Sequence, residues 1–417
     1  MSASVIDEED DVTPAWTNWV GNQSCRPAEI VSPETEAEVQ SAVRSAASAG
    51  RSLRAAASGH SFSPICTTDG TLLDMSRLAG IVGIDAQAET VTVYPGTTIA
   101  ALGDPLWEHG LALRNQGDID SQQIAGAVST ATHGSGIALQ NMSASLRAAR
   151  LVTASGEVVE IDERMPELLA AAQVSVGMLG VFTELTLALR PAYQLRETLR
   201  YWDLDELSRG WADGFRSSHH FTFHYFPTAA ANDLFDFEAP PGLDLTRMSR
   251  VTTCEIVGLD ETEDLQSEPR VGRPYRVYPQ YCAPNFHELE YMVDLADGQD
   301  AFGEVLEVFD RFPEFATYPI EVRSTAADGA HLSPNHERAS LVISVSGEPG
   351  RAYQPFLQAV HDVLLGYRAR PHWGKLSRFT REELESVLPR HGDFVALRRQ
   401  LDPEGIFLNE WLRPLFA

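Results

Sequence analysis

The chain has 417 residues, of which 43% are hydrophobic, and a formal net charge of -27. Because one core stops growing at roughly 250–300 residues, more than one domain is expected. The acidic balance disfavours nucleic acid and anionic membrane surfaces as partners, and no run of about 20 apolar residues is present to span a bilayer.

The cysteines and the first residues indicate a reducing compartment. Cys25, Cys66, Cys254 and Cys282 lie too far apart in the sequence for a disulfide framework and form no C-x-x-C pair. Residues 1–13 are acidic rather than basic and then apolar, which predicts a frayed tail and not a signal peptide. A cytoplasmic location is expected.

Helical and strand patterns alternate over the first 190 residues. Val39, Val43 and Ala46 have helical spacing, and the pattern stops at Gly50, which predicts a helix over about 34–49. The expected elements that follow are strands over 71–75, 81–84 and 89–94, a helix over about 98–109, a hairpin of 150–153 with 157–161, and a strand over 181–189. Arg190-Pro191 then indicates a domain boundary. Longer aromatic strands such as 221–226 follow, so the fold class is α+β.

Common nucleotide and metal motifs are missing. No G-x-x-x-x-G-K-[ST] is present, and the glycine run at Gly134 and Gly136 fails as a dinucleotide fingerprint at Leu139. No H-E-x-x-H is present, and the histidines at 219, 220 and 224 are expected to be ordinary strand residues. We therefore expect no metal, and an NAD-dependent sugar dehydrogenase conflicts with the missing fingerprint.

Two loops rich in small and hydroxyl residues stand out, 58–64 and 125–136, each with one histidine. Such loops let the backbone approach a ligand and offer N–H and hydroxyl groups to phosphates. Lys375 is compositionally unusual, because it is the single lysine in a chain with 31 arginines. A lysine presents a compact ammonium on a flexible stem, which the wide guanidinium of arginine cannot do.

These features resemble the FAD-linked oxidoreductases of the vanillyl-alcohol oxidase type (the PCMH-type fold), in the branch of aldonolactone oxidases and dehydrogenases and alditol oxidases. The matching segments are 58–64, 115–120 with 132–134, 321–323, 372–375 and 402–409. The resemblance implies an FAD-binding domain of two α+β subdomains over 14–190, a substrate (cap) domain with an antiparallel sheet over 191–370, and a C-terminal segment, 371–417, that returns to the FAD domain.

By the same resemblance, His60 is the residue that links covalently to FAD, and a single link is expected because residues 115–136 contain no cysteine. The other residues carried over as cofactor-binding are Ala57, Ser58, Gly59, Ser61, Gly117, Asp118, Gln123, Gly126, Ser129, Thr130, Thr132, His133, Gly180, Val181 and Lys375.

The resemblance also supplies catalytic and substrate residues. Glu321 and Arg323 are two residues apart, so their side chains share one face of a strand, and the family places such a pair beside flavin N5, the hydride acceptor. Glu321 is the candidate base, but pairing with arginine is expected to weaken it. Lys375 is the candidate cation beside the reduced flavin, and all three count as catalytic. The substrate is expected to contact Asp118, Glu321, Arg323, Ser344, Ser346 and Lys375.

Three positions bear on the acceptor and substrate. Gly117 matches a site where glycine leaves room for O2, which favours an oxidase that releases H2O2. Asp118 and Ser344 replace a serine and a histidine of the alditol oxidases, which favours an aldono-1,4-lactone of the gulono, galactono or arabinono type. The alternatives are an alditol oxidase, an aldonolactone dehydrogenase with another acceptor, and a flavin-fold binding protein without turnover. The oligomeric state stays open, and a monomer is compatible with the sequence.

Overall fold

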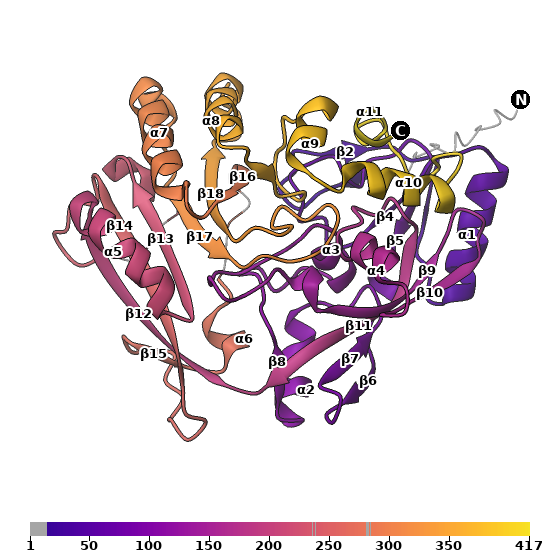
Figure 1. Ribbon diagram of the computed structural model, residues 1–417, viewed down its shortest axis with the longest axis horizontal. Coiled ribbons are helices and arrows are strands. Elements are labelled where there is room, and N and C mark those ends of the chain that lie inside the picture. The colour runs from indigo at the N-terminus through magenta and orange to yellow at the C-terminus, as the bar shows by residue number, and fades with distance from the viewer. Residues whose placement is uncertain (1–14, 236, 238, 281–282, 284) are drawn as a thin grey trace, which may run out of the picture.

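The computed structural model describes residues 15–235, 237, 239–280, 283 and 285–417. The expected acidic tail over 1–13 and Cys282 lie outside the described residues. The N-terminal sheets occupy one half of the molecule and a large antiparallel sheet the other half (Figure 1). No helix in the described part of the chain is long and apolar enough to cross a bilayer.

The smallest of the three larger sheets is parallel and carries the first glycine-rich loop. Its strand order is β3 (Glu29–Val31), β5 (Thr71–Asp74) and β4 (Leu53–Ala56). The helix α1 (Glu36–Ser48) confirms the predicted helix, with Thr35 as its N-cap and Val39, Val43 and Ala46 buried. The short pair β1 (Trp16–Thr17) and β2 (Ser24–Cys25) precedes it.

A six-stranded antiparallel sheet completes this half. It has the order β10-β9-β11-β7-β6, with β8 paired to β11, and the predicted hairpin is confirmed as β9 with β10. The strands are β6 (Ile81–Asp85), β7 (Thr90–Val93), β8 (Leu111–Leu113), β9 (Leu146–Val152), β10 (Val158–Ile161) and β11 (Val181–Pro191). The helices of this region are α2 (Gly103–Glu108), α3 (Ile124–Ser129) and α4 (Pro166–Gln173). The predicted helix over 98–109 begins as a 3-10 turn at Ala100–Leu102.

The second half is an eight-stranded sheet, ordered β15-β12-β14-β13-β17-β18-β16-β19. Its strands are β12 (Gln194–Asp203), β13 (His220–Phe226), β14 (Met248–Val257), β15 (Arg270–Gly272), β16 (His287–Asp294), β17 (Ile320–Thr325), β18 (Ser340–Gly347) and β19 (Arg370–Pro371). The helices α5 (Leu204–Ser217), α7 (Gly298–Arg311) and α8 (Gln354–Gly366) contact this sheet, and α6 (Pro274–Val277) packs beside β12 and β15.

Alternation along the central strands gives this sheet two unlike faces. Phe223, Val322, Ile343 and Tyr291 stand opposite one another on neighbouring strands and are buried, and the Phe223 ring packs against Phe302 of α7. The residues one position along each strand therefore point to the other face, away from the helices. That face carries the polar groups of the candidate site.

The C-terminal segment attaches to the N-terminal half, where α9 (Arg381–Val387), α10 (His391–Leu401) and α11 (Arg413–Phe416) appear in yellow near the indigo strands (Figure 1). The backbone N–H of Leu53 donates to the Ile406 carbonyl at 2.7 Å, and the amide of Asn409 donates to the carbonyls of Pro64 and Thr67. The segment that resembles the family's ending thus fixes the loop that follows His60. The domain boundaries themselves stay a prediction.

Candidate active site

Two cavities meet at His60. The first, here called the glycine-lined cavity, lies between β4, the two glycine-rich loops and β11. The second, the acidic pocket, lies on the polar face of the eight-stranded sheet. His60, Ser61, Gln122 and Thr130 line both cavities, so the acidic pocket adjoins one end of the glycine-lined cavity.

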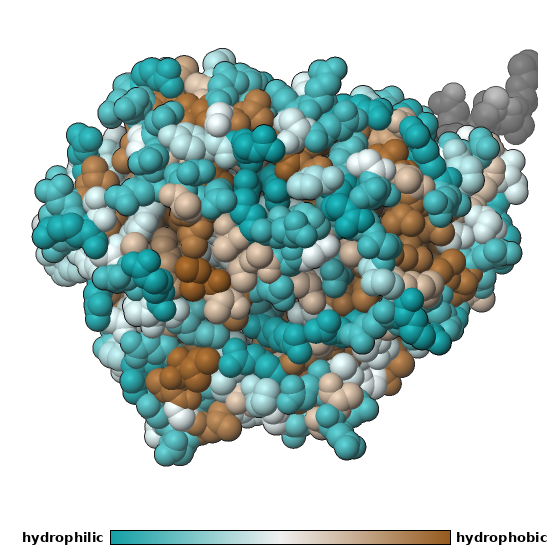
Figure 2. Space-filling model, viewed as in Figure 1, coloured by the Kyte–Doolittle hydropathy of each residue, from teal (hydrophilic) through white to brown (hydrophobic). Residues whose placement is uncertain are grey.

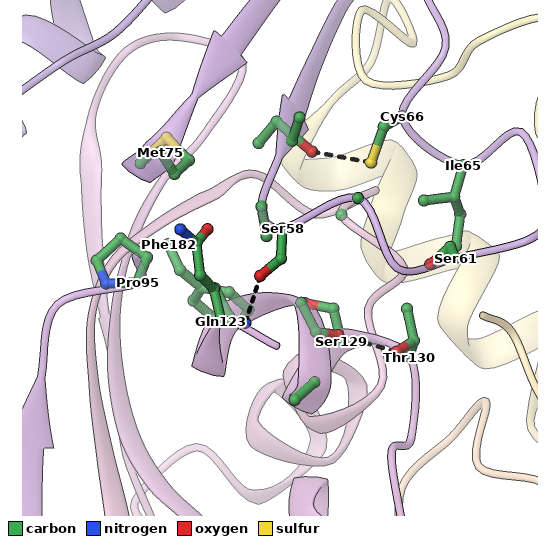
Figure 3. Close-up of a pocket in the computed structure, with 18 of the residues that line it drawn as sticks. Ser58, Ser61, Ile65, Cys66, Met75, Pro95, Gln123, Ser129, Thr130 and Phe182 are labelled. Atoms are coloured by element: carbon green, nitrogen blue, oxygen red, sulfur yellow. Dashed lines mark hydrogen bonds between the residues drawn. The ribbon is translucent and has the colours of Figure 1, made fainter. Parts of the chain in front are cut away.

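The glycine-lined cavity contains most of the residues that were expected to bind the cofactor. Figure 3 shows Gln123, Ser129 and Thr130 on its lower side, with Ser58 and Ser61 above them. The expected residues among its lining are Ala57, Ser58, Gly59, His60, Ser61, Gln123, Gly126, Ser129, Thr130, Gly180 and Val181. The Ser58 hydroxyl accepts a hydrogen bond from the Gln123 N–H at 2.9 Å and donates to the Ser121 carbonyl, which ties the two loops together.

Small residues keep this cavity open. A Cβ added at Gly126 would lie 3.2 Å from the Ala57 Cβ, and Gly59 has a φ of +69°, which favours glycine. The buried Oε1 atoms of Gln122 and Gln123 have no hydrogen-bond partner among the described residues. A long polar cofactor that brings donors and a flat ring fits these features. Ser58 to Ser61, Gln123, Gly126, Ser129 and Thr130 would hold FAD there.

The loop that carries His60 is fixed by the segment with the single lysine. The Phe62 N–H donates to the Gly374 carbonyl, and the Ser63 hydroxyl donates to the Trp373 carbonyl, both at 2.7 Å. The His60 ring packs against Trp19 at 4.9 Å between centroids. Burial, followed by the charge of Lys375, lowers the pKa of His60 to about 4, so its imidazole is neutral.

A row of polar residues crosses the sheet below the acidic pocket. His224, Glu321, Ser344 and Glu290 are direct partners on β13, β17, β18 and β16. Residues opposite one another in an antiparallel sheet lie on the same face. Four separate segments of the chain therefore contribute to one site.

Arg323 is the centre of the charged network. Its Nη2 lies 2.5 Å from Glu290 and 3.4 Å from Glu321, and its Nη1 lies 3.2 Å from Asp118, which comes from a loop of the N-terminal half. Glu290 is fully buried and also contacts His133 and the Ser344 hydroxyl. Although burial opposes its ionisation, Arg323, His133 and Lys375 hold the pKa of Glu290 well below its usual range.

Glu321 behaves differently from Glu290. Burial raises the pKa of Glu321 to about 8, and Arg323 only partly offsets this effect. Arg323 is shared with Glu290 and Asp118, and these carboxylates, with Glu288, add repulsion. At Glu321, burial therefore outweighs the lowering of the pKa by Arg323, and the role of this residue as a base stays a prediction. A carboxyl group with a pKa near 8 is suited to exchange protons at neutral to alkaline pH.

Lys375 also lies in the acidic pocket. Its ammonium donates to the Glu288 carboxylate and stands 5.3 Å from the centre of the Phe62 ring. Burial opposes its charge, but Glu288 and Glu290 raise its pKa above the usual range. Lys375 is therefore charged, and Glu288 balances that charge.

Most of the predicted site residues line one of the two cavities. Asp118, Glu321, Arg323, Ser344, Ser346 and Lys375 all line the acidic pocket. Gly117, Thr132 and His133 line neither cavity. His133 lies behind Glu290, at 2.9 Å, and a Cβ on Gly117 would meet the Thr132 methyl at 2.9 Å. A cofactor role for these three residues stays a prediction.

Sequence reasoning missed Glu288 and Glu290. Their signal is visible in the pattern of β16, where two acidic residues alternate with Leu289 and Tyr291 in a buried strand. Carboxylates are rarely buried unless they are paired, so this alternation is a sequence signal for a charged site. His220 and His224, which were expected to be strand histidines, lie on β13, and His224 is 3.6 Å from Glu321.

Comparisons with known proteins agree with this architecture. Residues 27–162 match the FAD binding domain family, and residues 247–415 match the D-arabinono-1,4-lactone oxidase family. The chain is 34% identical to L-gulono-1,4-lactone dehydrogenase of Mycobacterium tuberculosis, over 96% of this chain and 99% of the relative. It is 32% identical to alditol oxidase of a Streptomyces species, over 97% of this chain and 99% of that relative.

Solved structures show the same fold. Cholesterol oxidase from B. sterolicum superposes with a TM-score of 0.81 over 97% of this chain and 96% of that chain, at 15% identity. 6-Hydroxy-D-nicotine oxidase from Arthrobacter nicotinovorans superposes with a TM-score of 0.70 over 91% of this chain and 90% of that chain, at 18% identity.

The fold and the two matched families define an FAD-dependent oxidoreductase. Within this class, the chain belongs to the vanillyl-alcohol-oxidase-type family, in the branch of aldonolactone oxidases and dehydrogenases and alditol oxidases.

Proposed function

We propose that this protein oxidises a CH–OH group of an aldono-1,4-lactone, of the gulono, galactono or arabinono type, and uses O2 as acceptor with release of H2O2. One observation carries the proposal. The acidic pocket holds Glu321, Arg323 and Lys375 and adjoins the glycine-lined cavity at His60. A sugar bound by these side chains would lie next to the cofactor.

Bound FAD supplies a two-electron acceptor in this reaction. Glu321 takes the proton of the reacting hydroxyl on its carboxylate. Arg323 donates to the same oxygen. Its guanidinium can orient that oxygen because the ion pair with the buried Glu290 holds the guanidinium in place. Lys375 adds a fixed positive charge to the pocket.

The substrate class rests on the polar groups that replace those of alditol oxidases. Asp118 adds a carboxylate 3.2 Å from Arg323, and Ser344 donates to Glu290 at 2.7 Å. Both side chains are compact and have oxygen atoms that can accept hydrogen bonds, which suits the hydroxyl groups of a lactone ring. An alditol is the second candidate, because alditol oxidase is about as similar to this chain as the gulonolactone dehydrogenase.

A panel of aldonolactones, alditols and sugars tests the proposal on the holoenzyme. Flavin bleaching without oxygen identifies the donor, and peroxide production in air identifies an oxidase. Lactones should bleach the flavin faster than alditols, and peroxide should form at the rate of turnover. Bleaching without peroxide would assign a dehydrogenase, and binding without bleaching would contradict turnover altogether.

The covalent link is tested at His60. Its neutral imidazole keeps the nitrogen lone pair that a bond to carbon needs. We expect the yellow colour of acid-precipitated wild type to stay in the pellet and that of His60→Ala to pass into the supernatant. His109→Ala, at an exposed histidine, is the control and should keep the colour in the pellet. Release of all flavin from wild type would contradict the link.

The role of Glu321 predicts a pH profile. Because the carboxylate is the form that accepts the proton, flavin reduction should be slow below the pKa and rise to a plateau above pH 8. Below the pKa the rate should change about tenfold per pH unit. Glu321→Gln should lower the plateau by roughly 10²–10⁴-fold and remove this limb. The measurement is anaerobic stopped-flow reduction, and an unchanged limb in the variant would assign the titration to another group.

A further inference from the structure

A third cavity lies beside the acidic pocket. This outer cavity shares the side chains Phe235, Gln280 and Phe286 with the acidic pocket, so the two adjoin through a common wall. Nothing in the chemistry proposed above uses its remaining residues. It opens over β12 and β14, further along the same sheet.

The polar row of the sheet runs through both spaces. Tyr201 of β12 stands opposite Arg250 of β14, Arg250 stands opposite His224 of β13, and His224 stands opposite Glu321. Neighbouring strands are roughly 4.8 Å apart, so Arg250 lies two strands and about 10 Å from Glu321 along the sheet. That span is comparable with the length of a disaccharide.

Charges in the outer cavity are balanced among the described residues. Arg270 pairs with Glu197 at 2.7 Å, and the remaining charged groups of the lining are Arg250 and Glu268. An anion in this space would face both carboxylates. A cation would likewise face both arginines, so the lining favours a neutral ligand.

The rest of the lining combines aromatic rings with neutral polar side chains. Tyr201, Phe235, Phe237 and Phe286 provide ring faces, and the Arg250 guanidinium stacks 4.4 Å from the centre of the Phe237 ring. Gln266, Ser267 and Gln280 also line the cavity and offer amide and hydroxyl groups, so a ligand that has both ring faces and hydroxyl groups suits this lining.

We propose that the outer cavity is a glycosyl subsite. In this reading the protein accepts sugar-derived substrates that carry a second, non-reacting sugar ring, and the outer cavity holds that ring while the first sugar occupies the acidic pocket. The inference deepens the proposed function and rests on it, because it defines the substrate class of the same site.

The test compares gulono- and galactono-1,4-lactone with their 6-O-hexosyl derivatives on the holoenzyme. The readout is kcat/KM from anaerobic flavin bleaching. At least one derivative should exceed its parent lactone by roughly tenfold, the gain expected from one or two net hydrogen bonds.

A blocking variant places that gain in the outer cavity. Gln266 is exposed and lines the outer cavity but not the acidic pocket. Gln266→Trp places a bulky ring in the outer cavity and should abolish the advantage of the derivative while the parent lactone stays within about twofold. Gln266→Ala removes the same side chain without filling the space and should keep the advantage. Ser267→Trp is a second blocking variant at the neighbouring position.

The outcomes separate the two proposals. Oxidation of the parent lactones without any gain for the derivatives, or equal losses for both in the tryptophan variants, would overturn the subsite and leave the proposed function intact. Failure of all lactones to bleach the flavin would overturn the proposed function and the subsite with it.

Discussion

Arg323→Met is expected to lower kcat/KM by about a thousandfold, since a preorganised charged donor at the reacting oxygen contributes an effect of this size. Arg323→Lys should also fail to restore activity, because one ammonium cannot replace a fork that contacts Asp118, Glu290 and Glu321 together. Steady-state kinetics on the leading donor of the substrate panel measures both variants.

Arg323 also neutralises a fully buried carboxylate, so the methionine variant should lose about 3–5 kcal/mol of unfolding free energy. The double variant Arg323→Met/Glu290→Gln removes both charges and should recover most of that stability. Its activity should stay low. Recovery of activity in the double variant would show that Arg323 acts only by balancing Glu290.

Lys375→Met is expected to slow flavin reduction by roughly 10²–10³-fold through loss of the fixed positive charge. Lys375→Arg keeps the charge but replaces a compact ammonium that fits between Glu288 and the Phe62 ring. We expect this variant to be slower than wild type by about tenfold or more. Anaerobic stopped-flow reduction and the flavin midpoint potential are the two readouts.

A matched variant separates the charge of Lys375 from its structural pairing. Glu288→Gln leaves the lysine in place but removes the carboxylate that helps to raise its pKa. Lys375→Met/Glu288→Gln removes both charges, so it should be stable and still slow. Near-normal reduction in Lys375→Arg would contradict a role for the lysine beyond its charge.

The network around Arg323 shows how this site sets different protonation states in neighbouring carboxyl groups. Glu290 receives the short contact from Arg323 and a second contact from His133, so it stays ionised. Glu321 has the longer contact with Arg323, and burial dominates. Carboxyl groups with separated pKa values are the usual way in which one site provides both an anchor and a base.

The sequence by itself determined the local features of this protein. Helical spacing around Val39, the two loops of small residues and the strand pair of Glu321 with Arg323 depend on residues close together in the chain, so each could be recognised without the fold. The resemblance then assigned His60 and Lys375 to one site, and the comparisons confirmed the family.

Only the tertiary structure decided which carboxylates surround Arg323 and Lys375 and how they ionise. Glu288 and Glu290 face Arg323 and Lys375 because β16 lies next to β18 in the sheet, a pairing that joins distant segments. The pKa of Glu321 depends on burial and on one arginine divided among three carboxylates. These effects arise from distances across the sheet and from exclusion of water, which local spacing in a sequence does not contain.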